Sequence, residues 1–139
     1  MSYSYLMSGP WLAQGSVPPH GVYGIPFDVI VLAAIEHQDI DLPGYHVIRV
    51  PLDDSALAQR VGPSKVDRMR IRHTAREIAD RIRHRERVLV TCAQGRNRSG
   101  VLAGLALRDL GLPGAEAARR IRLARNGLTN KHFHAMVVG

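Results

Sequence analysis

The chain has 139 residues, of which 45% are hydrophobic and 22% are charged, which is the usual size and mix for one soluble globular domain with a buried core. Its single cysteine excludes an internal disulfide, no segment approaches the roughly 18 apolar residues of a membrane span, and the N-terminus lacks an export signal, so a cytoplasmic protein is expected. The net charge of +7 is carried mostly by arginine, which favours either a polyanionic partner or a basic surface that keeps the protein soluble.

Three short apolar runs rich in β-branched residues predict strands at residues 27–32, 46–50 and 88–91. Continuous apolar runs are typical of strands buried on both faces, as in the middle of a parallel sheet. Between the second and third runs, apolar residues recur at helical spacing among charged ones. They predict an amphipathic crossover helix over residues 64–84, with an apolar face made of Val66, Met69, Ala75, Ile78 and Ile82.

The second half of the chain is predicted to be helical. After Gly100 the sequence VLAGLAL is apolar on every side, which in so short a helix indicates a buried central position. Residues 114–125 and 130–138 predict two further helices. Because no repeat or linker divides the chain, we expect a single α/β domain over residues 1–139, with a central, mostly parallel sheet flanked by helices.

The sequence VLVTCAQGRNRSGVLAG, residues 88–104, places Cys92 between the third predicted strand and the buried helix. The intervening loop then lies at a helix N-terminus, where unpaired N–H groups and the helix dipole attract anions, and a tight glycine-containing loop can add an anion-binding nest. A cysteine in that field is expected to ionise readily and to act as a nucleophile.

Other residues of the loop suit the same chemistry. Arg98 is placed to hold two oxygens of a tetrahedral anion, and Ser99 can donate a hydrogen bond to a thiolate leaving group. Gly95 and Gly100 permit tight backbone geometry. Taken singly, these residues could be an inert core thiol, a surface arginine, a helix cap and simple turn residues, but their order between a strand and a buried helix favours a catalytic loop.

The segment VTCAQGRNRSG resembles the phosphate-binding loop of the cysteine-dependent protein tyrosine phosphatase superfamily, Cys-x5-Arg-Ser/Thr, and the chain is most similar to the dual-specificity branch. Weaker similarity runs through YLMSGPWL, FDVIVLAAIE, YHVIRVPLDD and ARRIRLARNGLTNKHF. The resemblance implies that Cys92 forms a phosphocysteine intermediate, that Arg98 clamps the phosphate and that Ser99 helps the thiolate leave. Asn130 matches a loop-supporting asparagine, whereas Thr91 stands where the family commonly has histidine. The phosphate-binding residues implied are Ala93, Gln94, Gly95, Arg96, Asn97 and Arg98.

Such a reaction also needs a general acid for the leaving oxygen. Asp53 and Asp54 in PLDDSALAQ follow the second predicted strand, where the family places its acid. The register favours Asp54, with Asp53 second, although adjacent aspartates also serve as turn formers or helix caps. The mechanism requires no metal or other cofactor, and the scattered histidines, including His132 and His134, show no ligand spacing.

Arg96 and the arginines of one predicted helix have more than one interpretation. Arg96 lies on the loop itself and either strengthens the binding of additional phosphates or faces solvent. The helix over residues 114–125 has arginines that are read as a solvated face rather than a docking strip for a polyanion. They are Arg119, Arg120, Arg122 and Arg125.

The favoured function is that of a protein tyrosine or dual-specificity phosphatase acting on phosphoproteins. One alternative is a phosphoinositide phosphatase, since such members of the superfamily carry a basic residue at the position of Arg96. Another is an RNA 5′-triphosphatase, whose Asn-Arg-Thr-Gly ending resembles residues 97–100. A non-enzymatic alternative is a phosphate-binding module that has lost activity. The sequence does not indicate an oligomeric state.

Overall fold

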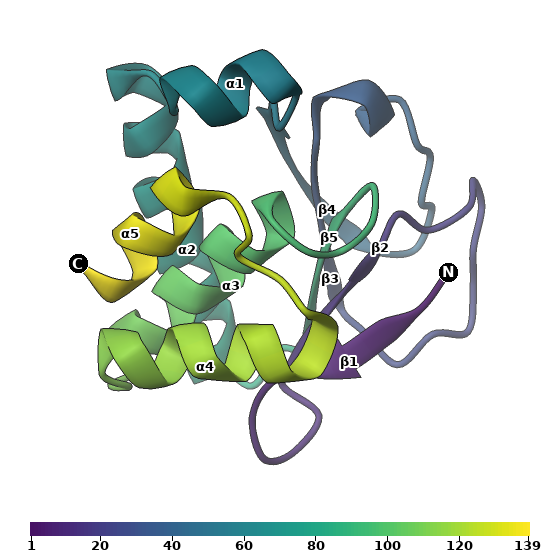
Figure 1. Cartoon of the computed structure of the whole chain (residues 1–139). Helices are drawn as coiled ribbons and strands as arrows, with labels where there is room; N and C mark the ends of the chain where they lie inside the picture. The colour runs from purple at the N-terminus through teal and green to yellow at the C-terminus, as the bar shows by residue number, and fades with distance from the viewer.

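The computed structural model describes all residues from 1 to 139, and five strands form one mixed sheet in the order β1-β2-β5-β3-β4 (Figure 1). β1 is antiparallel to β2, and all other neighbouring strands are parallel. The three predicted strands are present with ends shifted by at most two residues, whereas the two N-terminal strands were not predicted. The strands are β1 (Tyr3–Tyr5), β2 (Leu12–Ser16), β3 (Val29–Ala34), β4 (His46–Leu52) and β5 (Val88–Cys92).

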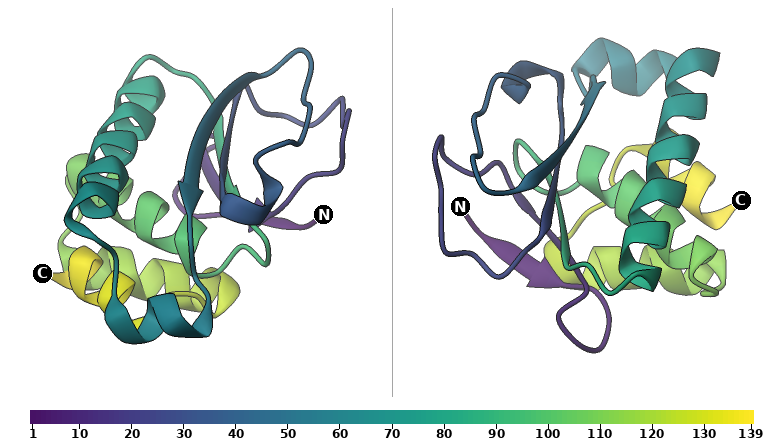
Figure 2. Two further views of the ribbon diagram at one scale, coloured as in Figure 1. Left: turned by 90° about the horizontal axis from the view of Figure 1, so that it is seen from above. Right: turned by 180° about the vertical axis from the view of Figure 1, so that it is seen from behind.

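All five α-helices lie on the same side of the sheet (Figures 1 and 2). Four of them confirm predictions, and the short helix between β4 and the crossover helix was not predicted. They are α1 (Ala56–Val61), α2 (Lys65–Arg83), α3 (Arg98–Asp109), α4 (Gly114–Arg125) and α5 (Lys131–Val138), with one 3₁₀ turn, η1 (Ile35–His37), directly after β3. No helix combines the length and the hydropathy needed to cross a lipid bilayer.

The central strands β3 and β5 are buried along their whole length, as their apolar runs predict. Side chains alternate between two cores: Val29 and Val31 pack with the helices, whereas Ile30 and Leu32 face the other side of the sheet. There the cover comes from Phe27, Ile40 and Leu42 in connecting segments and not from helices. The predicted α/β class is therefore correct, with helices on one face only.

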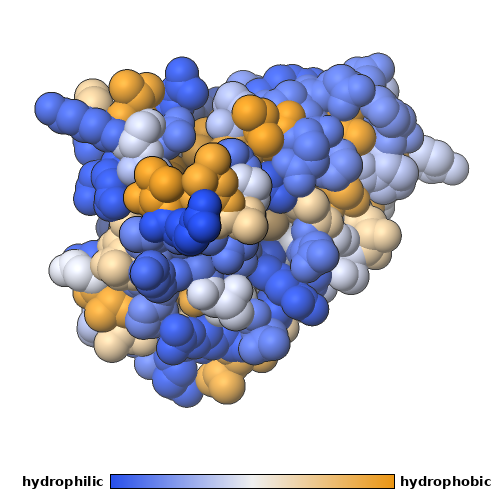
Figure 3. All heavy atoms as spheres, turned by 45° about the horizontal axis from the view of Figure 1, so that its top comes forward, coloured by the Kyte–Doolittle hydropathy of each residue, from blue (hydrophilic) through white to orange (hydrophobic).

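The buried face of α2 differs from the predicted one at its N-terminal end. Val66 and Met69 are 57% and 62% exposed. α2 has 19 residues and α3 has 12, so at 1.5 Å per residue α2 is about 10 Å longer. Because Arg83 and Asp109 pair the two helices at their C-terminal ends, the extra turns of α2 project past α3. Figure 3, which brings the α1 end forward, shows apolar atoms among hydrophilic ones on this surface.

Candidate active site

Cys92 ends the central strand β5 and lies at the carboxyl edge of the sheet, where open α/β sheets bind ligands. The loop of residues 93–97 connects it to α3, and none of the five backbone N–H groups of this loop donates a hydrogen bond within the protein. Gly95 has φ +70°, and a Cβ there would collide with the carbonyl carbon of Gly15 in β2. Only glycine fits this approach, which lets the loop curl tightly beside the sulfur.

Ser99 is hydrogen bonded to Cys92, with 3.2 Å between Oγ and Sγ. Nε2 of Gln14 donates to the same Oγ at 3.0 Å and also to the carbonyl oxygens of Gly95 and Arg96. Since Gln14 occupies a lone pair of Ser99, the hydroxyl proton is free to turn toward sulfur once Cys92 has lost its own proton. Ser99 therefore contacts the thiol, and no side chain caps α3. Gln14 was not predicted; its only sequence signal is an amide beside Leu12 and Ala13.

Arg98 is buried, and its guanidinium is held by two elements at the same sheet edge. Nη2 donates to Oε2 of Glu36 at 2.8 Å, while Nη1 donates to Oε1 of Glu36 and to the Leu52 carbonyl oxygen at 3.1 Å. These bonds use three of the five N–H donors of arginine. The two that remain are on Nε, which has no partner, and on Nη2, so one edge of the fork is available to a tetrahedral anion.

Glu36 was not predicted, although an acid directly after a buried strand at the carboxyl edge is a usable signal. The hydrogen bond from Arg98 lowers the pKa of Glu36 from its ordinary 4.5 to about 2, against the opposing effect of partial burial. Burial disfavours the charge of Arg98, but the hydrogen bond to Glu36 and the nearby Cys92, Glu36 and Asp54 together raise the pKa of Arg98. Both groups of the pair are therefore charged at neutral pH.

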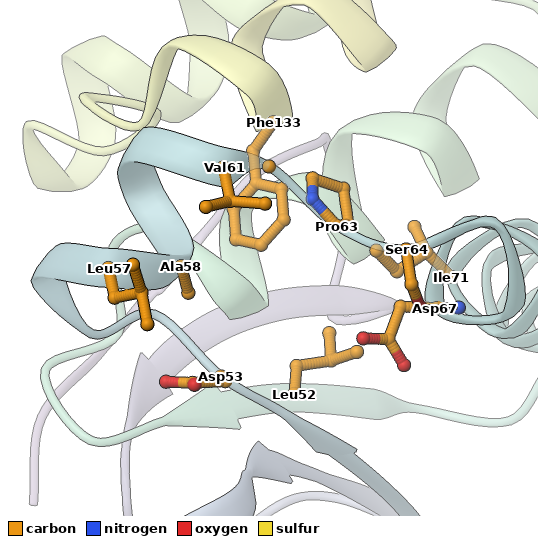
Figure 4. Close-up of a pocket in the computed structure, with 11 residues that line it drawn as sticks. Leu52, Asp53, Leu57, Ala58, Val61, Pro63, Ser64, Asp67, Ile71 and Phe133 are labelled. Carbon is orange, nitrogen blue, oxygen red and sulfur yellow. Dashed lines mark hydrogen bonds between the residues drawn. The ribbon is translucent and has the colours of Figure 1, made fainter.

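The two candidate acids lie on opposite sides of their loop. Asp54 faces Cys92: its Oδ1 accepts from Nδ2 of Asn130 at 2.8 Å, and its Oδ2 accepts from Nδ2 of Asn97 at 3.0 Å. Asp53 instead accepts from the backbone N–H of Ser55 at 2.8 Å. It lies at the edge of a separate, mainly apolar hollow of about 280 Å³ under α1 (Figure 4). The geometry thus brings only Asp54 toward the sulfur.

Asn130 connects three parts of this arrangement. Its Oδ1 caps α5 by accepting from the N–H groups of His132 and Phe133. Its backbone N–H donates to Oδ1 of Asn97 at 3.0 Å, so the same residue holds both the loop and Asp54. Asn130 thus links α5, the loop and Asp54 through hydrogen bonds.

A polar hollow of about 310 Å³ opens over the sulfur, and we call it the Cys92 hollow. Most of the predicted site residues line it, whereas Gly95 and Ser99 are buried and Asn130 and Asp53 do not line it. Arg96 lies exposed at its edge and makes no ion pair. The residues that line the hollow are Glu36, Asp54, Gln59, Cys92, Ala93, Gln94, Arg96, Asn97 and Arg98. No group of three His, Cys, Asp or Glu side chains is arranged to hold a metal ion.

No family model and no curated protein sequence matches the chain, but solved structures do. Human DUSP28 superposes with a TM-score of 0.72 at 22% identity, covering 97% of this chain and 89% of that one. Tk-PTP in its active form superposes with a TM-score of 0.71 at 21% identity, covering 98% of this chain and 93% of that one. OH1 from the Orf virus, a tyrosine phosphatase, superposes with a TM-score of 0.68 at 16% identity, covering 98% of this chain and 84% of that one.

The fold is that of the tyrosine and dual-specificity phosphatases. The likeness extends over nearly the whole chain, so the similarity read from the Cys-x5-Arg segment is also a similarity of fold. Within this phosphatase fold, the hydroxyl of Thr91 donates to the Val31 carbonyl oxygen at 2.7 Å. The hydroxyl of Thr91 therefore ties β5 to β3.

One arginine of α4 departs from the predicted solvated face. Arg119 and Arg120 pair with Glu116 on the surface, but Arg125 turns toward the loop of residues 93–97. Its Nε donates to the Gly95 carbonyl oxygen at 2.9 Å, and its Nη2 donates to that of Gln94 at 3.4 Å. These bonds turn the carbonyl side of the loop away from the Cys92 hollow, which leaves the N–H side for an anion.

Proposed function

We propose that the chain is a cysteine-dependent phosphatase that hydrolyses phosphate monoesters of proteins, with residues 1–139 as one catalytic domain. The observation that carries the proposal is the convergence of Cys92, the unpartnered N–H groups of residues 93–97 and the free edge of Arg98 on one hollow. These N–H donors suit the oxygens of a phosphoryl group, because hydrogen bonds and the positive charge of Arg98 stabilise its negative charge. The chemistry needs a free thiol, so a reducing compartment such as the cytoplasm suits it.

In the first step, the Cys92 thiolate attacks phosphorus and the bond from phosphorus to the leaving oxygen breaks. The loop N–H groups and Arg98 hold the three other oxygens, which carry the charge of the transition state. Asp54 gives its proton to the leaving oxygen. Protonated Asp54 can keep one amide contact on its carbonyl oxygen while its O–H points into the hollow.

In the second step, water attacks the phosphocysteine and Asp54, now a carboxylate, takes a proton from that water. The sulfur–phosphorus bond breaks, which returns the thiolate and releases inorganic phosphate. Ser99 donates its hydrogen bond to the departing sulfur, as the position of Gln14 allows. Glu36 acts on neither bond; it fixes the plane of the Arg98 guanidinium.

The test is hydrolysis of an aryl phosphate by the wild type and by Cys92→Ser, with EDTA present because Arg98 and the loop N–H groups supply the charge that a metal would otherwise provide. We expect the variant to keep the wild-type circular dichroism spectrum and to lose at least about a thousandfold in kcat. Acid quenching should trap labelled phosphate on Cys92 of the wild type. Substantial turnover by Cys92→Ser would refute the nucleophile.

The substrate class is tested by measuring phosphate release from three substrates in parallel: phosphopeptides, phosphoinositides and 5′-triphosphorylated RNA. We expect the highest kcat/KM for a phosphopeptide. A higher value for either of the other two would move the chain to the corresponding alternative, for which Arg96 at the edge of the Cys92 hollow would supply the additional cation.

A further inference from the structure

A second hollow adjoins the Cys92 hollow. It has a volume of about 340 Å³ and lies between α1 and the start of α5. Gln59 lines both hollows, so they are neighbours on the surface. We call it the Arg60 hollow; its lining residues are Ala56, Gln59, Arg60, Thr129 and Lys131.

The two cations of the Arg60 hollow are without acidic partners. Seven other arginines of the chain form ion pairs, but neither Arg60 nor Lys131 does. No acidic side chain lines this hollow. It therefore offers two unneutralised positive charges beside the place where the substrate phosphate is proposed to lie.

The polar residues between the two hollows are fixed by the active-site residues. Nε2 of Gln59 donates to the Asp54 carbonyl oxygen at 3.0 Å, and the Thr129 hydroxyl donates to Oδ1 of Asn97 at 3.2 Å. The ring of His132 lies 3.3 Å from the Arg60 carbonyl oxygen and joins the end of α1 to α5. Arg60 and Lys131 are thus attached to the two elements that position Asp54.

We propose that Arg60 and Lys131 bind a second anionic side chain of the substrate peptide, a phosphate or a carboxylate near the phosphorylated residue. The inference rests on the proposed function, because the first phosphate must lie against Cys92. Exposed ion pairs are individually weak, so the subsite acts on the choice among substrates more than on the fold.

The surroundings favour a peptide over RNA or a membrane. No aromatic side chain lines either hollow, so unpaired bases would find nothing on which to stack. On the other side of α1, Asp53 and Asp67 line the apolar hollow and would repel an anionic bilayer. Leu57 and Val61 of α1 are 61% and 72% exposed and can contact apolar side chains of a peptide.

The experiment uses phosphopeptides that differ at a single position, which lies one to three residues from the phosphorylated residue. This varied position holds alanine, glutamate or phosphoserine. We expect wild-type kcat/KM to be about tenfold higher for the best acidic peptide than for the alanine peptide, and the preference to shrink as salt is added. The ratio should fall to below about twofold in R60Q/K131Q. Glutamate and phosphoserine peptides distinguish a carboxylate from a phosphate as the preferred group.

The matched control is R72Q/R76Q. It removes the same charge from two arginines without ion pairs that line a different hollow, between α2 and α3. It should keep the wild-type ratio. An equal loss in both double variants, or no acidic preference in the wild type, would overturn the subsite. A preference confined to phosphoinositides or triphosphorylated RNA would overturn the peptide assignment.

A binding measurement separates this inference from the proposed function. Cys92→Ser, with and without R60Q/K131Q, is titrated with the same peptides. If the wild type hydrolyses none of these peptides, while Cys92→Ser binds acidic peptides more tightly in a way that depends on Arg60 and Lys131, the phosphatase is refuted and the subsite is kept. Turnover without any acidic preference would refute the subsite alone.

Discussion

Arg98 divides its hydrogen-bond donors between the protein and the substrate. Glu36 and the Leu52 carbonyl oxygen hold one edge of the guanidinium, and Nε on the other edge is buried without a hydrogen-bond partner in the protein. A planar guanidinium held in this way loses little conformational entropy when an oxyanion binds to it. The pairing of Arg98 with Glu36 therefore orders the clamp in advance.

The pH dependence of stability tests this pair. The pKa of Glu36 is lowered to about 2 from 4.5, so its contribution to stability is complete above pH 4.5 and is lost as the pH falls toward 2. The Glu36 side chain is 48% exposed, and solvent screening limits the contribution to about 1 kcal/mol. We expect urea unfolding of the wild type and Glu36→Gln to differ most at pH 7 and 5 and to converge near pH 2.5. A constant difference would contradict the assignment.

The two aspartates give a second prediction. Asp54→Asn should slow the burst of cysteine phosphorylation for esters of weakly acidic phenols by about a hundredfold, because it removes the proton for the leaving oxygen. The burst rate for esters whose leaving group is already a stable anion should hardly change. Asp53→Asn is the matched control, since Asp53 contacts Ser55 and not the Cys92 hollow.

Rapid-quench bursts are the measurement, because the same carboxylate also assists the second step. Selective loss in Asp53→Asn alone would reverse the assignment. If neither variant discriminates between esters, this loop does not supply the acid, and the triphosphatase alternative gains because a pyrophosphate leaving group needs no proton.

At the scale of elements, the sequence predicts those whose own side chains carry a pattern. β3 and β5 are continuous apolar runs, and the apolar stripe of α4 locates it correctly. β2 reads LAQGS, whose Gln14 and Gly15 make sense only against the loop that they support. α1 has no buried residue, so no amphipathic pattern reveals it.

The role of α4 in holding the loop gives a third prediction. Arg125→Gln should lower kcat/KM for an aryl phosphate by about tenfold and the free energy of unfolding by about 1–2 kcal/mol, because the Gly95 and Gln94 carbonyl groups lose a charged donor. Arg119→Gln, on the same helix, breaks only a surface pair with Glu116 and should keep the wild-type kcat/KM. Equal losses in the two variants would indicate a general effect of charge.

At the scale of the molecule, the site is collected from nearly the whole chain. Gln14 and Ser99 are hydrogen bonded across 85 positions, Arg98 and Glu36 across 62, and Asn130 and Asp54 across 76. The parallel strands bring these residues to one edge of the sheet. Local sequence pattern predicts a role for Cys92, Arg98 and Ser99 because they lie on either side of one short loop, but it contains no information on which distant side chains will meet them. Gln14, Glu36 and Arg125 become recognisable only once the sheet order is known.

The position of Cys92 at the end of β5 also has a consequence for amide hydrogen exchange. β5 is paired with β2 and β3 on its two sides, so we expect its amide hydrogens to exchange only when the molecule opens globally. The next five N–H groups, residues 93–97, have no partner in the protein. We expect protection to drop abruptly across Cys92, and vanadate or another phosphate mimic to slow exchange in residues 93–97 while β5 stays as it was. Exchange measured by NMR would thus report occupancy of the site without any turnover, and unchanged rates in residues 93–97 at saturation would show that the anion binds elsewhere.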